Sequence, residues 1–116
     1  MTQTTKLPDS GEIVIVDFPG VTGTKRRPAV VLSSPAYHAA RPDVILGVIT
    51  TQIDSARAVT DYTLNDWKTA GLRKPSAFRA FVVTVPRSAI TARVGRLSET
   101  DWQAVRERLQ IALAQP

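Results

Sequence analysis

The stretch that decides the fold is KRRPAVVLS, residues 25–33, in which three consecutive cations are followed by a proline and an apolar run. Pro28 lacks a backbone N–H and biases Arg27, the residue before it, toward an extended conformation. The run Ala29–Leu32 is apolar and rich in valine, which is typical of a buried strand. This stretch therefore predicts a cationic loop fixed to the rigid start of a core strand. The alternative is a solvated charge run that caps an ordinary strand.

Further strands are expected on both sides of this stretch, because apolar and β-branched residues gather between prolines and glycines that favour turns. Pro19, Gly20 and Gly23 predict that the eight residues after Phe18 form a loop. The first two strands would then make a hairpin with a basic loop at its tip. The expected strands are Glu12–Phe18, Pro28–Ser34, Asp43–Thr51, Ala58–Leu64 and Ala77–Val85, and Ile90–Leu97 is expected to be a short sixth strand or a turn.

Other local features follow from single residues. Gly47, inside the third expected strand, indicates a bulge or a close approach of another part of the chain. Residues Pro35–Pro42 are expected to be an irregular connection, which contains the only histidine, His38, without an evident partner. Residues Asn65–Ala70 are expected to form one helical turn that Gly71 ends.

The last segment has the signals of a helix. Ser98 can cap its N-terminus, and Glu99 and Asp101 place acidic side chains in the first turn. Apolar residues then recur at helical spacing and give the helix one apolar face: Trp102, Val105, Leu109, Ala112 and Leu113. Strands first and a helix last predict an α+β chain that is mainly β, or a small barrel with a helix packed on it.

The bulk properties allow one domain. The 116 residues suffice for a single modest core, and we expect residues 1–10 to be a flexible tail and residues 11–116 to form one domain. The absence of cysteine excludes disulfides and thiolate metal sites. No apolar run approaches the roughly 18 residues of a membrane span, and the polar N-terminus lacks a signal-peptide pattern, so we expect a cytoplasmic protein with no membrane association.

The charge is strongly basic. The formal net charge is +5, and 11 of the 15 cationic side chains are arginines. A guanidinium binds phosphate through two parallel hydrogen bonds, so the excess of arginine over lysine favours phosphate recognition. A polyanion or an acidic protein is therefore the first candidate partner. High arginine usage across the genome is the alternative explanation.

Most enzyme chemistries lack the residues that they need. One histidine cannot supply a histidine pair for acid–base catalysis or a histidine-based metal site. The carboxylates are too scattered for a two-metal or calcium site, and the glycine spacing matches no nucleotide-binding loop. No metal or other cofactor is therefore expected.

Arginine and hydroxyl chemistry remains. An RNA strand carries its own nucleophile, the 2′-OH beside each phosphate, so an enzyme can cleave it by aligning that group and stabilising the charge that develops at phosphorus. Arg27, at the start of the second strand, and Thr50, at the end of the third, could supply both if those strand ends are neighbours.

The order of motifs resembles the MazF/PemK family of toxin–antitoxin ribonucleases, from about Gly11 to the last helix. The segments that carry the resemblance are Gly11–Val14, Asp17–Pro19, Lys25–Ser33, Val48–Ile53, Gly71–Ser76 and Val94–Ser98. The resemblance implies an SH3-like (CcdB/PemK-type) barrel of antiparallel strands with a C-terminal helix, working as a homodimer. It also implies metal-independent, sequence-selective cleavage of single-stranded RNA, usually mRNA, that leaves a 2′,3′-cyclic phosphate. The implied partner is a cognate antitoxin protein whose acidic, partly disordered segment covers the basic groove.

The same resemblance assigns roles to residues. The family's catalytic arginine and threonine fall on Arg27 and Thr50, and because a guanidinium stays protonated, we expect charge stabilisation from the arginine. Thr24 occupies the place of a loop hydroxyl that contacts RNA in relatives. The remaining expected RNA contacts, chosen for charge or a hydroxyl, are Lys25, Arg26, Thr51, Arg73, Lys74, Ser76 and Arg79.

Two departures from the family pattern leave other functions open. The first loop lacks a Glu-Gln pair that many members carry, and Ala80–Thr84 is apolar where many relatives place Glu, Gln and Arg. The alternatives are a toxin of the same fold that binds DNA gyrase, weakly supported by Trp102, and a non-catalytic RNA-binding barrel. Arg27 and Thr50 favour the nuclease, and the apolar fifth strand favours the binding proteins.

Overall fold

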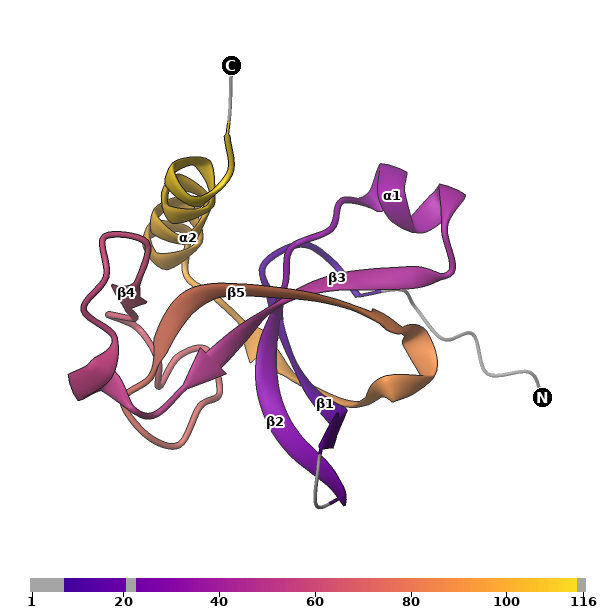
Figure 1. Cartoon of the computed structure of the whole chain (residues 1–116), viewed down its shortest axis with the longest axis horizontal. Helices are drawn as coiled ribbons and strands as arrows, with labels where there is room; N and C mark the ends of the chain where they lie inside the picture. Colours follow the sequence, from indigo (N-terminus) through magenta and orange to yellow (C-terminus); the bar gives the residue numbers. More distant parts are fainter. Residues whose placement is uncertain (1–7, 21–22, 115–116) are drawn as a thin grey trace.

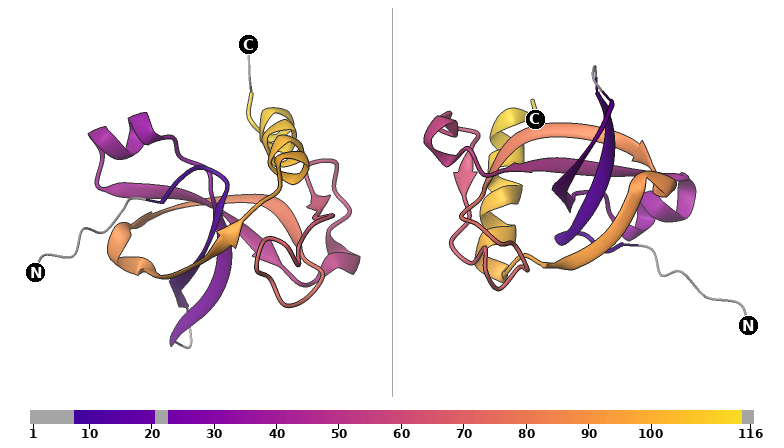
Figure 2. Two further views of the ribbon diagram at one scale, coloured as in Figure 1. Left: turned by 180° about the vertical axis from the view of Figure 1, so that it is seen from behind. Right: turned by 90° about the horizontal axis from the view of Figure 1, so that it is seen from below.

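The structure is a computed structural model that describes residues 8–20 and 23–114. The described chain forms a six-stranded antiparallel sheet in the order β4-β5-β3-β2-β1-β6, with helix α2 packed against it (Figure 1). The sheet is strongly curled and barrel-like (Figure 2). The strands are β1 (Glu12–Gly20), β2 (Gly23–Val31), β3 (Asp43–Thr50), β4 (Tyr62–Thr63), β5 (Ala77–Pro86) and β6 (Ile90–Arg96); the helices are α1 (Pro35–Ala40) and α2 (Glu99–Ala112), with short 3-10 turns η1 (Ile53–Ser55) and η2 (Arg87–Ala89). The predicted antiparallel barrel with a C-terminal helix is confirmed.

Successive side chains along each strand point to opposite faces, so the sheet carries two apolar cores. The helix-side core consists of Ile13, Val30, Ile49, Leu64, Ala70, Phe78, Leu97 and Val105. The groove-side core, on the opposite face, consists of Val14, Val16, Ala29, Val31, Val44, Leu46 and Val85. Burial on both faces explains why the central strands are continuous apolar runs.

Helix α2 begins and packs largely as the sequence predicts. The Ser98 side chain caps it by accepting the backbone N–H of Asp101 at 3.2 Å. Val105 is fully buried, and Trp102 and Leu109 pack against the helix-side core. Leu113, which the spacing placed on the same face, is the C-terminal cap and is exposed.

Asp101 does more than favour the start of the helix. Its carboxylate is fully buried and accepts hydrogen bonds from the Tyr62 hydroxyl at 2.6 Å and from the backbone N–H groups of Asn65 and Asp66 at 3.1 and 2.8 Å. Burial and the hydrogen bond to this carboxylate raise the pKa of the Tyr62 hydroxyl. The predicted strand Ala58–Leu64 shrinks to β4. The predicted single helical turn after it is confirmed, because the Ala70 N–H donates to the Asp66 carbonyl oxygen at 3.1 Å and Gly71, with φ 91°, ends the turn.

The first hairpin is longer than predicted, and the expected basic loop is wrong. The ladder between β1 and β2 continues to the pairs Pro19↔Thr24 and Gly20↔Gly23. Cross-strand pairing therefore overrides the turn preference of these prolines and glycines, and residues 25–27 lie on a paired strand. Pro28 is tolerated because the ladder to β3 starts only at Ala29.

The connection between β2 and β3 is ordered, which the sequence did not predict. Ser34 caps the short helix α1, and His38, a residue of this helix, is buried. The His38 Nε2 atom is hydrogen-bonded to Ser33 Oγ at 2.5 Å, and this oxygen also accepts the Ile45 N–H at 3.0 Å. Burial, with a smaller effect of the nearby Arg87 guanidinium, lowers the pKa of the His38 ring. The histidine that lacked a partner in the sequence is therefore part of the scaffold.

Gly47 marks both a close approach and a bulge, as the sequence indicates. A Cβ atom at this position would lie 2.4 Å from Cε1 of Phe78, whose ring is fully buried. The β3–β5 register shifts here: Gly47 pairs with Val82 but Ile49 with Phe78, so the three residues 79–81 face the single residue 48. Within this bulge Ala80 has φ 55°, in the left-handed region. The extra residues let β5 arch over β3 (Figure 1).

We expect Gly47→Ala to destabilise the protein by about 1–3 kcal/mol, because the methyl group must displace a packed ring. Chemical denaturation of the single variants and of the pair with Phe78→Leu measures this. The leucine lacks the ring atom that clashes, so Gly47→Ala should cost less in that background. An equal cost in both backgrounds would show that the ring does not impose the glycine.

Candidate functional site

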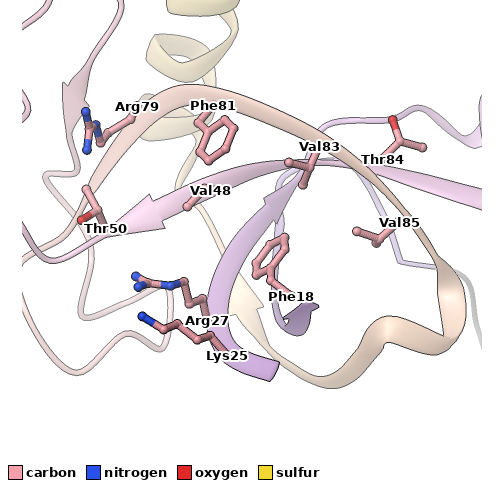
Figure 3. A pocket seen from close by; sticks show the side chains of 10 residues that line it. All are labelled: Phe18, Lys25, Arg27, Val48, Thr50, Arg79, Phe81, Val83, Thr84 and Val85. Carbon is pink, nitrogen blue, oxygen red and sulfur yellow. The ribbon is translucent and has the colours of Figure 1, made fainter. Parts of the chain in front are cut away.

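A groove of about 610 Å³ opens on the face of the groove-side core, between β2, β3 and β5 (Figure 3). Three cationic side chains, one threonine near them and a row of apolar side chains line it. The lining residues are Phe18, Lys25, Arg27, Val48, Thr50, Arg79, Phe81, Val83, Thr84 and Val85. The groove thus combines a cationic end with an apolar wall.

Strand β2 supplies two of the cations. Lys25 and Arg27 are two residues apart on the strand, so their side chains point to the same face, and both line the groove. Arg26, between them, turns to the other face, and its Nε donates to Asp17 Oδ1 at 2.9 Å. The hydrogen bond to Asp17, together with the charge of that carboxylate, raises the pKa of the Arg26 guanidinium. The side chains of Lys25 and Arg27 make no hydrogen bond or ion pair to any residue within 8–20 and 23–114, so both are available to an anion.

Thr50 lies at the same end of the groove as Arg27. The ladder between β2 and β3 ends at Ala29↔Val48, which is two residues from Arg27 on one strand and two from Thr50 on the other. The Thr50 Oγ atom accepts the Gln52 N–H at 3.0 Å. Its hydroxyl hydrogen has no acceptor in the described part of the chain, so it can donate to a ligand. The strand ends are therefore neighbours, as the chemistry requires.

Strand β5 forms the opposite wall. Arg79 and Phe81 lie in the bulge, and both line the groove together with Val83 and Val85 (Figure 3). Arg79 is exposed, and its side chain makes no hydrogen bond or ion pair with the described residues. It adds a third available cation on the side of the groove that faces β2.

A second hollow of about 310 Å³ lies beside the groove. Its lining includes all three cations of β2 and the exposed Thr51: Lys25, Arg26, Arg27, Pro28, Ile49 and Thr51. Lys25 and Arg27 border both hollows. The charges of Lys25 and Arg27 are therefore open to both hollows, whereas the Arg26 guanidinium in the second hollow is bonded to Asp17.

The remaining predicted site residues lie elsewhere. Arg73 and Lys74 are exposed in the segment between β4 and β5 and line neither hollow. Ser76 is 1% exposed and donates to the Lys74 carbonyl oxygen at 2.8 Å, so its hydroxyl is used within the fold. The Thr24 side chain lies outside the described residues.

The sequence interpretation missed the aromatic part of the groove. Phe18 and Phe81 line it, and neither was singled out. A signal was available in the sequence. Arg79, Phe81, Val83 and Val85 occupy every second position of the predicted strand, so a cation and a ring are expected on the same face.

The groove can bind anions and donate hydrogen bonds, but it holds no histidine or carboxylate. No group of three or more histidines and carboxylates that could hold a metal ion occurs within residues 8–20 and 23–114. In the same residues, no helix has the length and apolar character to cross a membrane.

Residues 9–113 match the family described as the PemK-like, MazF-like toxin of type II toxin–antitoxin systems. No curated protein matches the chain.

Among solved structures, the fold is similar to an endoribonuclease in complex with its cognate antitoxin from a mycobacterial species, with a TM-score of 0.77, 18% identity and coverage of 95% of this chain and 98% of that chain. It is also similar to the Mycobacterium tuberculosis toxin MazF-mt6, with a TM-score of 0.72, 21% identity and coverage of 90% and 98%. MazF from Deinococcus radiodurans gives a TM-score of 0.70, 24% identity and coverage of 96% and 100%.

If the groove binds a polyanion, affinity for a single-stranded DNA oligonucleotide should fall with salt, with a log–log slope of about −0.7 per phosphate contact. We expect Arg27→Ala to make the slope less steep by about 0.7. Arg26→Ala should change it less, because Asp17 already holds that guanidinium. Fluorescence anisotropy at several NaCl concentrations measures both. Equal effects of the two variants would mean that total charge, and not position in the groove, controls binding.

Proposed function

This chain belongs to the PemK-like, MazF-like toxins of type II toxin–antitoxin systems, and on that premise we propose that it is an endoribonuclease that cleaves single-stranded RNA without a metal ion. The observation that carries the proposal is that Arg27 and Thr50 line one groove, with Lys25 and Arg79 beside them. Fixed cations and a hydroxyl donor on paired strands are what charge stabilisation at phosphorus needs.

In the proposed reaction the RNA supplies the nucleophile. Its 2′-oxygen forms a bond to the adjacent phosphorus and loses its proton to solvent, and the bond from phosphorus to the 5′-oxygen breaks. That oxygen takes a proton from solvent. The products are a 2′,3′-cyclic phosphate and a 5′-hydroxyl, and DNA is resistant because it lacks the 2′-OH.

The protein's part is alignment and charge stabilisation. The Arg27 guanidinium donates to the non-bridging oxygens as their negative charge increases, since it stays protonated throughout. The Thr50 hydroxyl, oriented by the Gln52 N–H, donates its hydrogen to the same phosphate. Lys25 and Arg79 hold the flanking phosphates and keep the reacting groups aligned.

The proposed protein partner is a cognate antitoxin with an acidic segment. The net charge of +5 favours such a segment, and one of the similar structures is a complex with a cognate antitoxin. The homodimer stays a prediction from the resemblance, and the cytoplasmic location stays a prediction from the polar N-terminal sequence.

A non-catalytic RNA-binding barrel is the second candidate, because the exposed Phe81 in the groove gives β5 the character of a binding surface. No observation favours a gyrase inhibitor. Trp102, its sequence support, packs against the helix-side core beneath the Arg106 guanidinium.

We expect the purified protein to cut a long mixed-sequence single-stranded RNA in excess EDTA into fragments with cyclic phosphate ends. Arg27→Ala and Thr50→Val should each lower the rate about 10²–10³-fold, the usual cost of one lost donor to a developing oxyanion. Thr50→Ser keeps the hydroxyl and should retain most activity.

Arg26→Ala is the matched control, because it removes the neighbouring guanidinium from the other strand face and should cut nearly as well as the wild type. Circular dichroism should be unchanged for all variants, whose side chains lie outside both cores. Intact RNA with a folded wild-type protein would favour the binding barrel. Undiminished cleavage by Arg27→Ala would place the active site elsewhere.

A further inference from the structure

We propose that Phe81 is a stacking platform for one RNA base beside the cleaved phosphate, so that this strand holds the RNA by ring stacking and not by reading base edges. The proposal rests on the proposed ribonuclease function. It assigns to the apolar strand β5 a role in binding the substrate.

The exposure of Phe81 is the first argument. Phe81 is 63% exposed and is the only exposed aromatic residue within 8–20 and 23–114. The other large exposed apolar side chains in that part of the chain are aliphatic: Val59, Val82, Ile111 and Leu113. An exposed ring beside cations is the arrangement with which proteins bind single-stranded nucleic acids, because every base presents a π-face.

The position of the ring is the second argument. Phe81 lines the same groove as Arg27 and Thr50, and its ring projects over that groove in Figure 3. Arg79, two residues before Phe81 in the same bulge, lines the same groove. One nucleotide could therefore place its phosphate near Arg79 or Arg27 and its base on the Phe81 ring.

The backbone supports this placement. Residues 79–81 are the bulged segment that faces the single residue 48, and Ala80 at its centre has φ 55°. Bulges re-aim side chains, and left-handed backbone at a residue other than glycine is found preferentially at functional sites. Here the bulge carries both the cation and the ring.

The side chains that β5 gives to the groove are poorly suited to reading base edges. The residues that follow Phe81 on this face, Val83 and Val85, have no hydrogen-bonding side-chain atoms, and Thr84 is the one uncharged polar residue that β5 gives to the groove. Strand β5 therefore offers little discrimination by base edges. We expect the base beside the cut that meets this wall to vary, with a preference only for bases that stack well.

The test measures binding of a single-stranded RNA with 2′-O-methyl groups, which lacks the nucleophile, so affinity is measured without cleavage. Phe81→Ala should weaken binding about 5- to 150-fold, the fold-change expected from loss of one stacked base. Phe81→Trp should bind at least as tightly as the wild type, and Phe81→Leu should be nearly as weak as the alanine variant.

Val82→Ala is the matched control, because Val82 is the neighbouring exposed apolar residue and does not line the groove. It should bind RNA like the wild type. Thermal melting of each variant should match the wild type, since both side chains are exposed.

Three results would overturn the stacking role. The first is full RNA affinity in Phe81→Leu, which would assign the ring to an apolar contact such as an antitoxin side chain. The second is an equal loss of RNA affinity in Phe81→Ala and Val82→Ala, and the third is no loss of affinity in either variant. Cleavage of unmodified RNA by the wild type separates the two proposals. If the wild type cleaves RNA and the Phe81 variants bind it as tightly as the wild type, the proposed nuclease stands and the stacking role is wrong. If binding depends on Phe81 and the wild type does not cleave RNA, the stacking role stands and the proposed nuclease is wrong.

Discussion

The contact between the Phe78 ring and the backbone of Gly47 determines the shape of the functional face. No side chain fits between them, since a Cβ on Gly47 would lie 2.4 Å from the ring. The ring also belongs to the helix-side core, so it fixes β5 against β3 from the far face of the sheet. Beyond this contact the strand gains a bulge and arches, which opens the groove on the opposite face. Core packing and site geometry are therefore linked through one glycine.

The cations owe their placement to the first hairpin. Pairing of β1 with β2 as far as Gly20↔Gly23 places residues 25–27 on a strand. Because successive side chains of a strand point to opposite faces, the three cationic side chains are divided between the two faces of the sheet. Lys25 and Arg27 face the groove, while Arg26 pairs with Asp17. A mobile loop would have to be ordered when RNA binds, whereas a paired strand holds its guanidinium in advance, which is how preorganised electrostatic catalysis works.

The sequence predicted the parts of the fold that local patterns determine. The strand β5, the cap at Ser98 and the close approach at Gly47 follow from β-branched runs, a capping residue and a glycine within a strand. It could not predict the length of the first hairpin or the partners of His38 and Asp101, because these depend on residues distant in the chain. The expectation that Arg27 and Thr50 lie at one site came from the chemistry of RNA cleavage and from the family resemblance. Phe81 was missed because an aromatic residue in an apolar strand is normally expected in the core.

The most direct test of this account is an amide chemical-shift titration of the isotopically labelled protein with a 2′-O-methyl single-stranded RNA. We predict that the largest shifts fall on residues 25–27 of β2, 48–50 of β3 and 79–85 of β5, and that the exposed face of α2 and the helix α1 stay unchanged. Shifts centred on α1 or α2, with the groove unaffected, would contradict the assignment of the groove as the RNA site.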